Sequence, residues 1–445
     1  MSFKKKLLQG LSYSVVGVLV GNGLRFISSI FLTRLLAPDL FGVMLLANTF
    51  VYAAAMLSDV GLRSAIIQNS RADEVKYRDA VWTLIFLRGW VIAVFLLMLA
   101  LLLAGLQRFD QPFLEGVYSD HRMVDALILL ALSEVLGGAG SIHILLRERQ
   151  LDFKSLFYLN VLKQAFGVVV TVIWATLDPG VVALCSGAIA TNLFSMIYSH
   201  AVLGRSWPKF YWSPLEFVYI IRMGRWLLFG AVVVFLTNTV DRLYMGANLN
   251  SESLGVYSIA LTIGLLGQEI LQRAGNTVIF PALAGRLRDG AGNMSSDFYR
   301  IRRPFEVASI IIGLLMIVAG PAFVELIYDV RYATAGHLLQ LLGVASLLLA
   351  YDLASDAYLA MGKNFHHAVV SIARLLVLVV SLPYLVKTYQ AAGGALAIIV
   401  SRVISAMVIA FLSHRIKLYQ WRAELPYFLV VVLSLAVGSL FFDVT

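Results

Sequence analysis

Residues 11–68 decide the fold and read LSYSVVGVLVGNGLRFISSIFLTRLLAPDLFGVMLLANTFVYAAAMLSDVGLRSAIIQ. The stretch contains two apolar runs of roughly 24 residues, each long enough to cross a hydrocarbon core about 30 Å thick. The short turn Ala37-Pro38-Asp39 separates the two runs. We therefore predict two transmembrane helices joined by a tight turn.

One face of the first predicted helix is polar. Its polar residues follow the helical repeat and are Asn22, Arg25, Ser29 and Thr33. An ionised side chain near mid-helix, such as that of Arg25, costs about 2.5–3.5 kcal/mol in the membrane. We expect this stripe to face a bundle interior or a water-filled cavity, and the rest of the chain to supply the surrounding helices.

The composition is that of a polytopic membrane protein. The 445 residues are 60% hydrophobic and only 14% charged. The net charge of +9 is spread over short segments between apolar runs, so no basic nucleic-acid-binding domain is predicted. The single cysteine, Cys185, allows no internal disulfide and no thiolate metal cluster.

The predicted fold is all-α, with about thirteen (twelve to fourteen) transmembrane helices. The predicted spans are 11–34, 40–62, 80–105, 122–145, 155–176, 180–203, 222–241, 253–277, 305–328, 335–360, 366–386, 392–413 and 425–442. We expect two pseudo-symmetric six-helix lobes around a central cavity, because Gly42-Val43 and Thr49 recur at one constant offset as Gly255-Val256 and Thr262. The predicted parts are lobe 1–205, cytoplasmic linker 206–221, lobe 222–414 and an extra C-terminal helix in 415–445.

The distribution of basic residues predicts the orientation. With the N-terminus in the cytoplasm, roughly 23 of the 35 lysines and arginines fall in cytoplasmic segments and about five on the opposite face. Thirteen spans then leave the C-terminus outside, whereas twelve or fourteen would return it to the cytoplasm.

Charged residues inside the predicted spans are the main candidates for function. Four basic residues lie deep in their spans and are predicted to line a cavity: Arg25, Arg88, Lys163 and Arg374. The acidic candidates for counter-charges or a coupling-ion site are Asp59, Asp241, Glu269, Asp352 and Asp356. Asp352 and Asp356 share a helix face, and spacing leaves open whether they bind a cation or proton or neutralise Arg374.

The other interpretation of embedded charges is structural. Residues near predicted helix ends, such as Arg34, Asp59, Arg242, Glu325 and Arg402, can extend to the interface or pair between helices. The uncharged candidates for lining the cavity are Asn22, Ser29, Asn48, Tyr52, Asn160, Gln164, Thr237, Asn238, Gln268 and Gln272.

The sequence lacks the motifs of common catalytic and ATP-driven sites. There is no G-x-x-x-x-G-K-[ST], H-E-x-x-H, G-x-S-x-G or Cys/His metal spacing. We therefore predict a membrane transporter rather than an enzyme, with no catalytic residue, no metal and no cofactor, and leave open coupling to Na⁺ or H⁺.

The opening stretch also resembles a known family. LTRLLAPDLFGVMLLANTF followed by LSDVGLRSAIIQ is similar to the start of the Wzx-type polysaccharide transporters. These are lipid-linked oligosaccharide flippases of the multidrug/oligosaccharidyl-lipid/polysaccharide (MOP) exporter superfamily. The matching residues are Thr33 to Leu36, Pro38, Phe41-Gly42, Leu57 to Leu62 and Ala65 to Gln68.

The resemblance implies a two-lobed bundle in the bacterial inner membrane that works by alternating access. Its cargo would be a polyprenyl-pyrophosphate-linked repeat unit of O-antigen, exopolysaccharide or capsule. On this reading Arg25, Arg88, Lys163 and Arg374 would contact the pyrophosphate. The implied partners are this glycan lipid, the bilayer, and the glycosyltransferases and glycan polymerase of the same pathway.

Three alternatives remain from the sequence. A cation-coupled multidrug exporter of the same superfamily would favour an acidic cavity, whereas the deep charges here are mainly basic. A membrane glycan polymerase or ligase would carry a large outer loop, and the predicted outer loops are short. A scaffold for biosynthetic enzymes would use the embedded charges only for structure.

Overall fold

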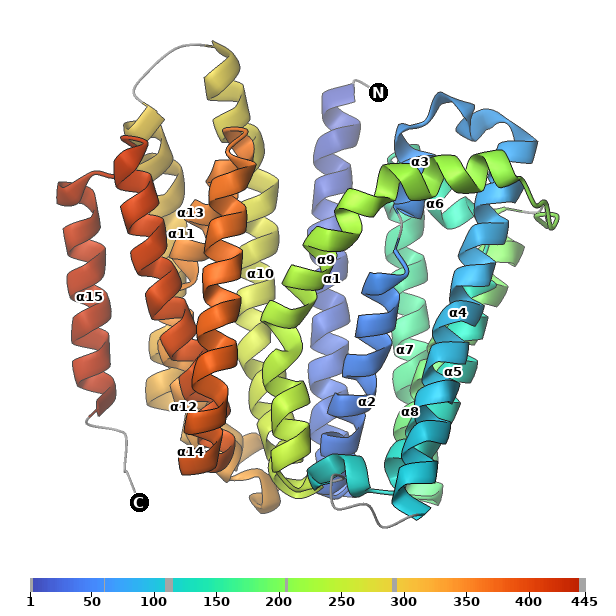
Figure 1. Ribbon diagram of the computed structural model, residues 1–445, viewed down its shortest axis with the longest axis horizontal. Helices are drawn as coiled ribbons and strands as arrows, with labels where there is room; N and C mark the ends of the chain where they lie inside the picture. The colour runs from blue at the N-terminus through green and yellow to red at the C-terminus, as the bar shows by residue number, and fades with distance from the viewer. Residues whose placement is uncertain (1–2, 60, 109–114, 205–206, 290–293, 440–445) are drawn as a thin grey trace. The chain divides into compact units, whose positions relative to one another are not determined.

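The computed structural model describes residues 3–59, 61–108, 115–204, 207–289 and 294–439. These residues form helices and connecting turns, with no β-strand among them (Figure 1). The chain divides into two compact units, Met1–Phe235 and Leu236–Thr445. The division falls inside α9 (Pro214–Asn248), so the predicted linker, residues 206–221, belongs to the first unit.

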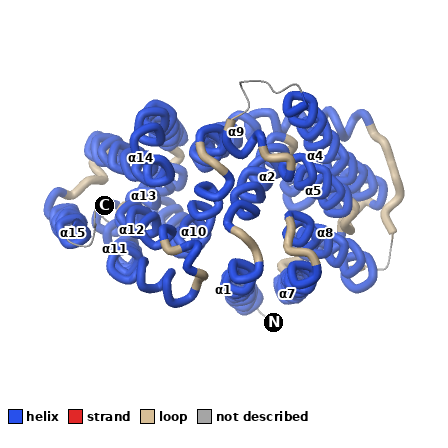
Figure 2. Tube along the Cα trace, turned by 90° about the horizontal axis from the view of Figure 1, so that it is seen from below, coloured by secondary structure: helices blue, strands red, loops and turns tan. Residues whose placement is uncertain are grey.

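The first unit contains eight further helices of the described chain. They are α1 (Phe3–Leu35), α2 (Pro38–Leu57), α3 (Leu62–Gln68), α4 (Val75–Arg108), α5 (Arg122–Gly138), α6 (His143–Arg149), α7 (Phe153–Leu177) and α8 (Val181–Tyr198). Short turns of helix occupy Ser70–Asp73, Gly116–Ser119 and Ser199–Leu203. In this unit α1 packs against α7, while α5 packs against both α4 and α8 (Figure 2).

Small residues allow the backbones of α4 and α5 to approach closely. A Cβ atom on Gly89 would lie 2.9 Å from the Cα of Gly138 and 2.8 Å from the carbonyl oxygen of Glu134. Only glycine fits this contact. Such small-residue interfaces are typical of membrane helices, where packing replaces the hydrophobic effect as the force that joins helices.

The second unit holds the end of α9 and the remaining helices. They are α10 (Ser251–Asp289), α11 (Met294–Ile327), α12 (Thr334–Leu347), α13 (Leu349–Ala360), α14 (Asn364–Arg415) and α15 (Trp421–Ser439), with a short turn at Val330–Tyr332. Here α11 packs on α12, and α14 packs on both α12 and α13 (Figure 2). The apolar core of the unit lies between these helices.

α14 is one element of 52 residues that is broken in the middle. At about 1.5 Å per residue it would be roughly 78 Å long, more than twice the thickness of a hydrocarbon core. Gln390 has a non-helical backbone (φ 50°, ψ −125°). A Cβ atom on Gly393 would lie 2.2 Å from the carbonyl oxygen of Leu385, so the chain reverses tightly here. The two arms of α14 correspond to the predicted spans 366–386 and 392–413.

α15 is fixed to the second unit by a buried ion pair. Arg302 of α11 donates from Nη1 to Oε1 of Glu424 at 2.5 Å. The hydroxyl groups of Tyr299 and Tyr351 donate to the same carboxylate at 2.8 and 3.0 Å. The predicted extra C-terminal helix is therefore part of the second unit.

The described helices support a multi-pass membrane protein. Eight of the described helices are long and apolar enough to cross a membrane, or up to ten if each bent pair counts as one span. The bent pairs are α5 with α6, at 58°, and the segment ending in α12 with α13, at 41°. The predicted number of thirteen spans is not confirmed. One reason is that the two arms of α14 are counted here as a single helix.

Candidate anion-binding site

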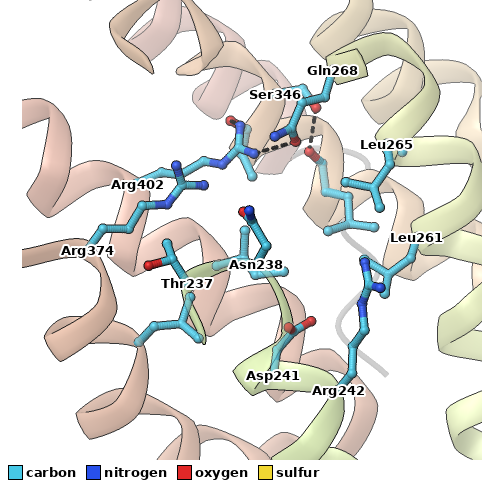
Figure 3. Close-up of a pocket in the computed structure, with 15 residues that line it drawn as sticks. Thr237, Asn238, Asp241, Arg242, Leu261, Leu265, Gln268, Ser346, Arg374 and Arg402 are labelled. Atoms are coloured by element: carbon cyan, nitrogen blue, oxygen red, sulfur yellow. Dashed lines mark hydrogen bonds between the residues drawn. The ribbon is translucent and has the colours of Figure 1, made fainter. Parts of the chain in front are cut away.

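A small cavity in the second unit is lined by arginine and amide side chains from four helices (Figure 3). Its volume is about 60 Å³, which is room for a few water molecules. The residues that line it are Thr237, Asn238, Asp241 and Arg242 of α9, Leu261, Gly264, Leu265 and Gln268 of α10, Leu342, Ala345 and Ser346 of α12, and Arg374, Leu378, Ile398 and Arg402 of α14.

Arg402 is held rigidly at one side of this cavity. Its side chain is only 6% exposed. Nη1 donates to the carbonyl oxygen of Ala345 at 3.0 Å, and Nη2 donates to Oε1 of Gln268 at 2.5 Å. Its Nε–H has no hydrogen-bond partner among the described residues. The guanidinium is therefore fixed by α10 and α12 while one donor stays available.

Arg374 lies beside Arg402 and is held more loosely. The guanidinium groups of the two residues lie next to each other in Figure 3. Nη1 of Arg374 donates to Oδ1 of Asp352, on α13, at 3.3 Å. The other oxygen of Asp352 lies 3.9 Å from Nη1 of Arg402. One carboxylate thus faces two guanidinium groups.

α9 supplies the polar residues on the other side of the cavity. Thr237 and Asp241 lie one turn apart, as do Asn238 and Arg242, so all four lie along one side of α9. Asn238 points toward the two arginines of α14 (Figure 3). Asp241 accepts a hydrogen bond of 2.8 Å from the hydroxyl of Tyr257, which is fully buried.

The charge of the cluster is positive. Among the described residues at the cavity, the positive charges of Arg242, Arg374 and Arg402 and the negative charges of Asp241 and Asp352 leave a formal charge of +1. Nε of each arginine is buried with no hydrogen-bond partner in the described chain. Arginine forms forked hydrogen bonds with phosphate and carboxylate oxygens, and a buried donor without a partner costs about 1–3 kcal/mol. An anion in this cavity would neutralise the net positive charge and accept hydrogen bonds from the Nε–H groups of the arginines.

Several predicted residues meet at this cavity. These are Arg374, Thr237, Asn238, Asp241 and Gln268, which line it, and Asp352, which contacts two of its arginines. Glu269 and Gln272 of α10 are not among its lining residues. The side chain of Asp356 lies outside the described residues, as does that of Arg273. No group of three or more His, Cys, Asp or Glu residues suited to a metal occurs in the described part of the chain.

A second basic pair lies in the first unit. Lys163 of α7 is within electrostatic range of Arg25 of α1, and these helices pack together. Arg25 is exposed and Lys163 is half-buried. The hydroxyl of Ser29 donates to the carbonyl oxygen of Phe26 and that of Thr33 to Ile30, at 2.7 and 3.1 Å. These two hydroxyls are thus bonded to their own helix.

The other uncharged candidates of the first unit differ in exposure. Asn48, Tyr52 and Asn160 are exposed, whereas Asn22 and Gln164 are half-buried. The ring of Tyr52 lies 5.9 Å from that of Phe235. A shared polar surface of these residues stays a prediction.

Arg88 and Asp59 make local contacts at the end of α2, and a structural role was the alternative interpretation of Asp59. Nη2 of Arg88 donates to the carbonyl oxygen of Ala55 at 2.7 Å, and Nε donates to the hydroxyl of Ser58 at 3.1 Å. Both partners lie at the C-terminal end of α2, where carbonyl groups lack partners within the helix and attract cations. Oδ1 of Asp59 accepts from the backbone of Gly61 in the following turn. Arg88 therefore caps the C-terminal end of α2, and its predicted contact with an anion stays a prediction.

Arg402 and Arg242 were not among the residues predicted to line a cavity, because both were placed near helix ends. α9 continues to Asn248, so Arg242 lies within the helix. Arg402 lies about ten residues inside the predicted span 392–413, at the depth of mid-helix. That depth was the signal in the sequence that could have identified it.

Comparison with known proteins places the chain in a family. A family model described as "Polysaccharide biosynthesis protein" matches residues 31–335, more than two thirds of the chain. The chain belongs to this family. The match begins inside α1 and ends at the start of α12.

Two relatives align with long stretches of this chain at low sequence identity. The Escherichia coli lipopolysaccharide biosynthesis protein WzxC is 22% identical over 353 residues, which cover 78% of this chain and 68% of WzxC. The Rhizobium meliloti succinoglycan biosynthesis transport protein ExoT is 24% identical over 285 residues. That alignment covers 64% of this chain and 55% of ExoT.

Solved structures confirm the fold. The lipid II flippase MurJ in its inward closed conformation matches with a TM-score of 0.69 and 14% identity, over 98% of this chain and 93% of MurJ. The Vibrio cholerae MATE transporter VcmN matches with a TM-score of 0.61 and 15% identity, over 95% and 98% of the two chains. The chain thus has the helical fold of these transporters, as predicted.

Proposed function

We propose that this protein is a flippase that moves a polyprenyl-pyrophosphate-linked oligosaccharide from the cytoplasmic to the outer leaflet of the bacterial inner membrane. The observation that carries the proposal is the cluster of Arg242, Arg374 and Arg402 around one cavity within a transporter fold. The names of WzxC and ExoT, which are biosynthesis and transport proteins of lipopolysaccharide and succinoglycan, support a glycan cargo.

The physical problem of such a cargo is its charged headgroup. A pyrophosphate cannot cross hydrocarbon without water or replacement partners, since burying an unpaired charge is prohibitively costly. The guanidinium groups of the cavity replace water around phosphate oxygens, and amides such as Asn238 and Gln268 can bond sugar or phosphate oxygens. The polyprenyl chain stays in the lipid while the headgroup passes through the protein by alternating access.

Arg25 and Lys163 provide a second cationic position in the first unit. Two positions on different units would let the headgroup keep a cationic partner during transport. We further propose a cytoplasmic N-terminus, from the distribution of basic residues. An inside-negative potential adds about 2.3 kcal/mol per charge per 100 mV to outward movement of an anion.

The second candidate is a cation-coupled multidrug exporter, which the fold of VcmN suggests. The cavity disfavours this candidate, because its formal charge is +1 and a cationic drug would meet three arginines. Coupling to Na⁺ or H⁺ is compatible with the flippase. Glycosyltransferases would act on the lipid-linked glycan before transport, and a glycan polymerase would act on it afterwards.

Reconstitution into liposomes tests the proposal. The purified protein is placed in vesicles that contain a fluorescent polyprenyl-pyrophosphate oligosaccharide, and transfer is measured as its exposure to a glycosidase added outside. We expect transfer of this lipid and no export of ethidium, a cationic dye. Export of ethidium without lipid transfer would replace the flippase by the multidrug exporter.

A further inference from the structure

The contact between Arg374 and Asp352 is a weak ion pair in geometric terms. It consists of one hydrogen bond of 3.3 Å, whereas strong pairs of this type measure about 2.7–2.9 Å and are often forked. The second oxygen of Asp352 is buried and makes no hydrogen bond within the described chain. By contrast, Glu424 of the same unit accepts from both Nη atoms of Arg302 and from two tyrosines.

Asp352 also lies between two cations that it cannot both satisfy. Its oxygens are 3.3 Å from Arg374 and 3.9 Å from Arg402, and Nε of each arginine is buried without a hydrogen-bond partner in the described residues. A phosphate group has three or four oxygens and could bond both guanidinium groups at once. It would therefore be a better ligand for this pair than the single carboxylate already present.

A carboxylate and a phosphate cannot share these arginines. Both are anions, and their repulsion inside a poorly hydrated cavity is strong. Arg402 keeps its position without Asp352, because the carbonyl oxygen of Ala345 and the amide of Gln268 hold it. Arg374 has the carboxylate of Asp352 as the hydrogen-bond partner that the structure assigns to it. The exchange therefore mainly concerns Arg374.

We propose that Asp352 is an exchangeable counter-ion: a phosphate ligand displaces it from Arg374 and Arg402, and its return promotes release of the ligand. This inference rests on the proposed function and deepens it, because it makes the cavity a phosphate or pyrophosphate site with a built-in competitor. The competitor lowers affinity, and a transporter needs a site that also empties.

The exchange would also couple the ligand to helix packing. Asp352 belongs to α13, and its partners Arg374 and Arg402 belong to the two arms of α14. α13 follows α12 after a bend of 41°. A ligand that removes the ion pair loosens α13 from α14. Because the coupling is reciprocal, the protein with α13 loosened binds the ligand more tightly. Occupancy of the cavity would thus be communicated to the bent α12–α13 segment.

Binding of inorganic pyrophosphate to the purified full-length protein in detergent tests the proposal. We expect Asp352→Asn to bind pyrophosphate about tenfold more tightly than the wild type, equivalent to about 1.4 kcal/mol. Asp352→Ser is a second neutral variant with the same expectation, and Asp352→Glu should restore nearly wild-type affinity. Asp329→Asn is the matched control, because Asp329 bonds Arg331 at 2.8 Å outside the cavity; its affinity should not change.

A variant with a damaged fold would bind pyrophosphate more weakly. Tighter binding by Asp352→Asn can therefore not be explained by a purely structural role of Asp352. In vesicles Asp352→Asn should transfer lipid more slowly despite its higher affinity. If both neutral variants bind pyrophosphate no more tightly than the wild type while Arg374→Gln abolishes binding, the anion site stands but the exchange of Asp352 is refuted. Unchanged binding in Arg374→Gln would instead overturn the site itself.

A competition experiment identifies the source of the phosphate. A short-chain polyprenyl pyrophosphate and free pyrophosphate compete for the wild-type site. We expect the prenyl compound to displace free pyrophosphate at a lower concentration, as a lipid headgroup site requires. Equal potency would assign the exchange to a soluble phosphate and contradict its role in the flippase.

Discussion

Nη2 of Arg402 lies 2.5 Å from Oε1 of Gln268, which connects the second arm of α14 to α10 inside the membrane-spanning part of the second unit. An amide carries no charge, so this contact positions the guanidinium without neutralising it, and the carboxylate of Asp352 lies 3.9 Å from Nη1 of Arg402. The cavity can therefore offer a fixed cation to a ligand. In a soluble protein an acidic residue is the more common partner for a buried arginine.

Replacing Gln268 by leucine removes an acceptor from a buried guanidinium. We expect Gln268→Leu to lose about 1–3 kcal/mol of stability, and to bind pyrophosphate more weakly because Arg402 moves. Gln268→Glu keeps the acceptor but adds a negative charge, so it should stay stable and still bind weakly. Thermal unfolding in detergent and pyrophosphate titration check the two effects separately. Equal binding in both variants and the wild type would remove Gln268 from the site.

The attachment of α15 depends on Glu424. Glu424→Ala removes one of two carboxylates beside Arg302, whose side chain is only 2% exposed and which keeps Glu306 at 3.0 Å, so we expect about 1–3 kcal/mol of destabilisation. Limited proteolysis should cut α15 first. Glu74→Ala, at an exposed ion pair with Arg71, is the control and should change stability by less than about 1 kcal/mol. Similar melting temperatures for the two variants would contradict the anchoring role of Glu424.

The contact of α4 with α5 tolerates no side chain at Gly89. Gly89→Ala places a Cβ atom 2.9 Å from the Cα of Gly138, and we expect a loss of about 1–3 kcal/mol from overpacking. Gly105→Ala in the same helix is the matched control, since nothing lies within 4 Å of its added Cβ. The melting temperatures of the two variants give the comparison, and a Gly89 variant as stable as the control would mean that the helices can separate at this point.

The basic pair of the first unit offers a test of the second cationic position. Arg25→Ala should reduce glycan transfer at least tenfold. Membrane insertion and melting temperature should stay normal, because the side chain of Arg25 is exposed. Arg331→Ala, an exposed arginine paired with Asp329, should transfer normally. If the Arg25 variant transfers the glycan lipid normally, Arg25 does not contact the headgroup, and the contacts proposed in the second unit remain.

Most of the fold could be predicted from the sequence, because apolar runs of membrane length have few alternatives to helix. The pair Gly393-Gly394 correctly indicated the reversal within α14. The bends in α5–α6 and α12–α13 were not predicted, since they lie inside apolar segments without proline. The bend between α5 and α6 falls at the glycine-rich stretch Gly137-Gly138-Ala139-Gly140, which was the local sequence signal for it.

The site was predicted less completely. Arg374 and Asp352 were recognised because their depth makes an unpaired charge expensive. The hydrogen bonds of Arg88 were not predicted, because its partners, the carbonyl oxygen of Ala55 and the hydroxyl of Ser58, come from the end of another helix. No pattern in a single sequence reports such a contact. The proposal that basic groups of both units face one chamber stays a prediction.

The proposed flippase requires that the arginines of the second unit hold the phosphate of a lipid-linked glycan. Lipid transfer in vesicles by Arg374→Gln, compared with the exposed control Arg331→Ala, tests it most directly. We predict that Arg374→Gln folds and inserts normally but transfers the fluorescent glycan lipid at less than a tenth of the wild-type rate, with the control unchanged. Transfer at the wild-type rate by Arg374→Gln would contradict the account.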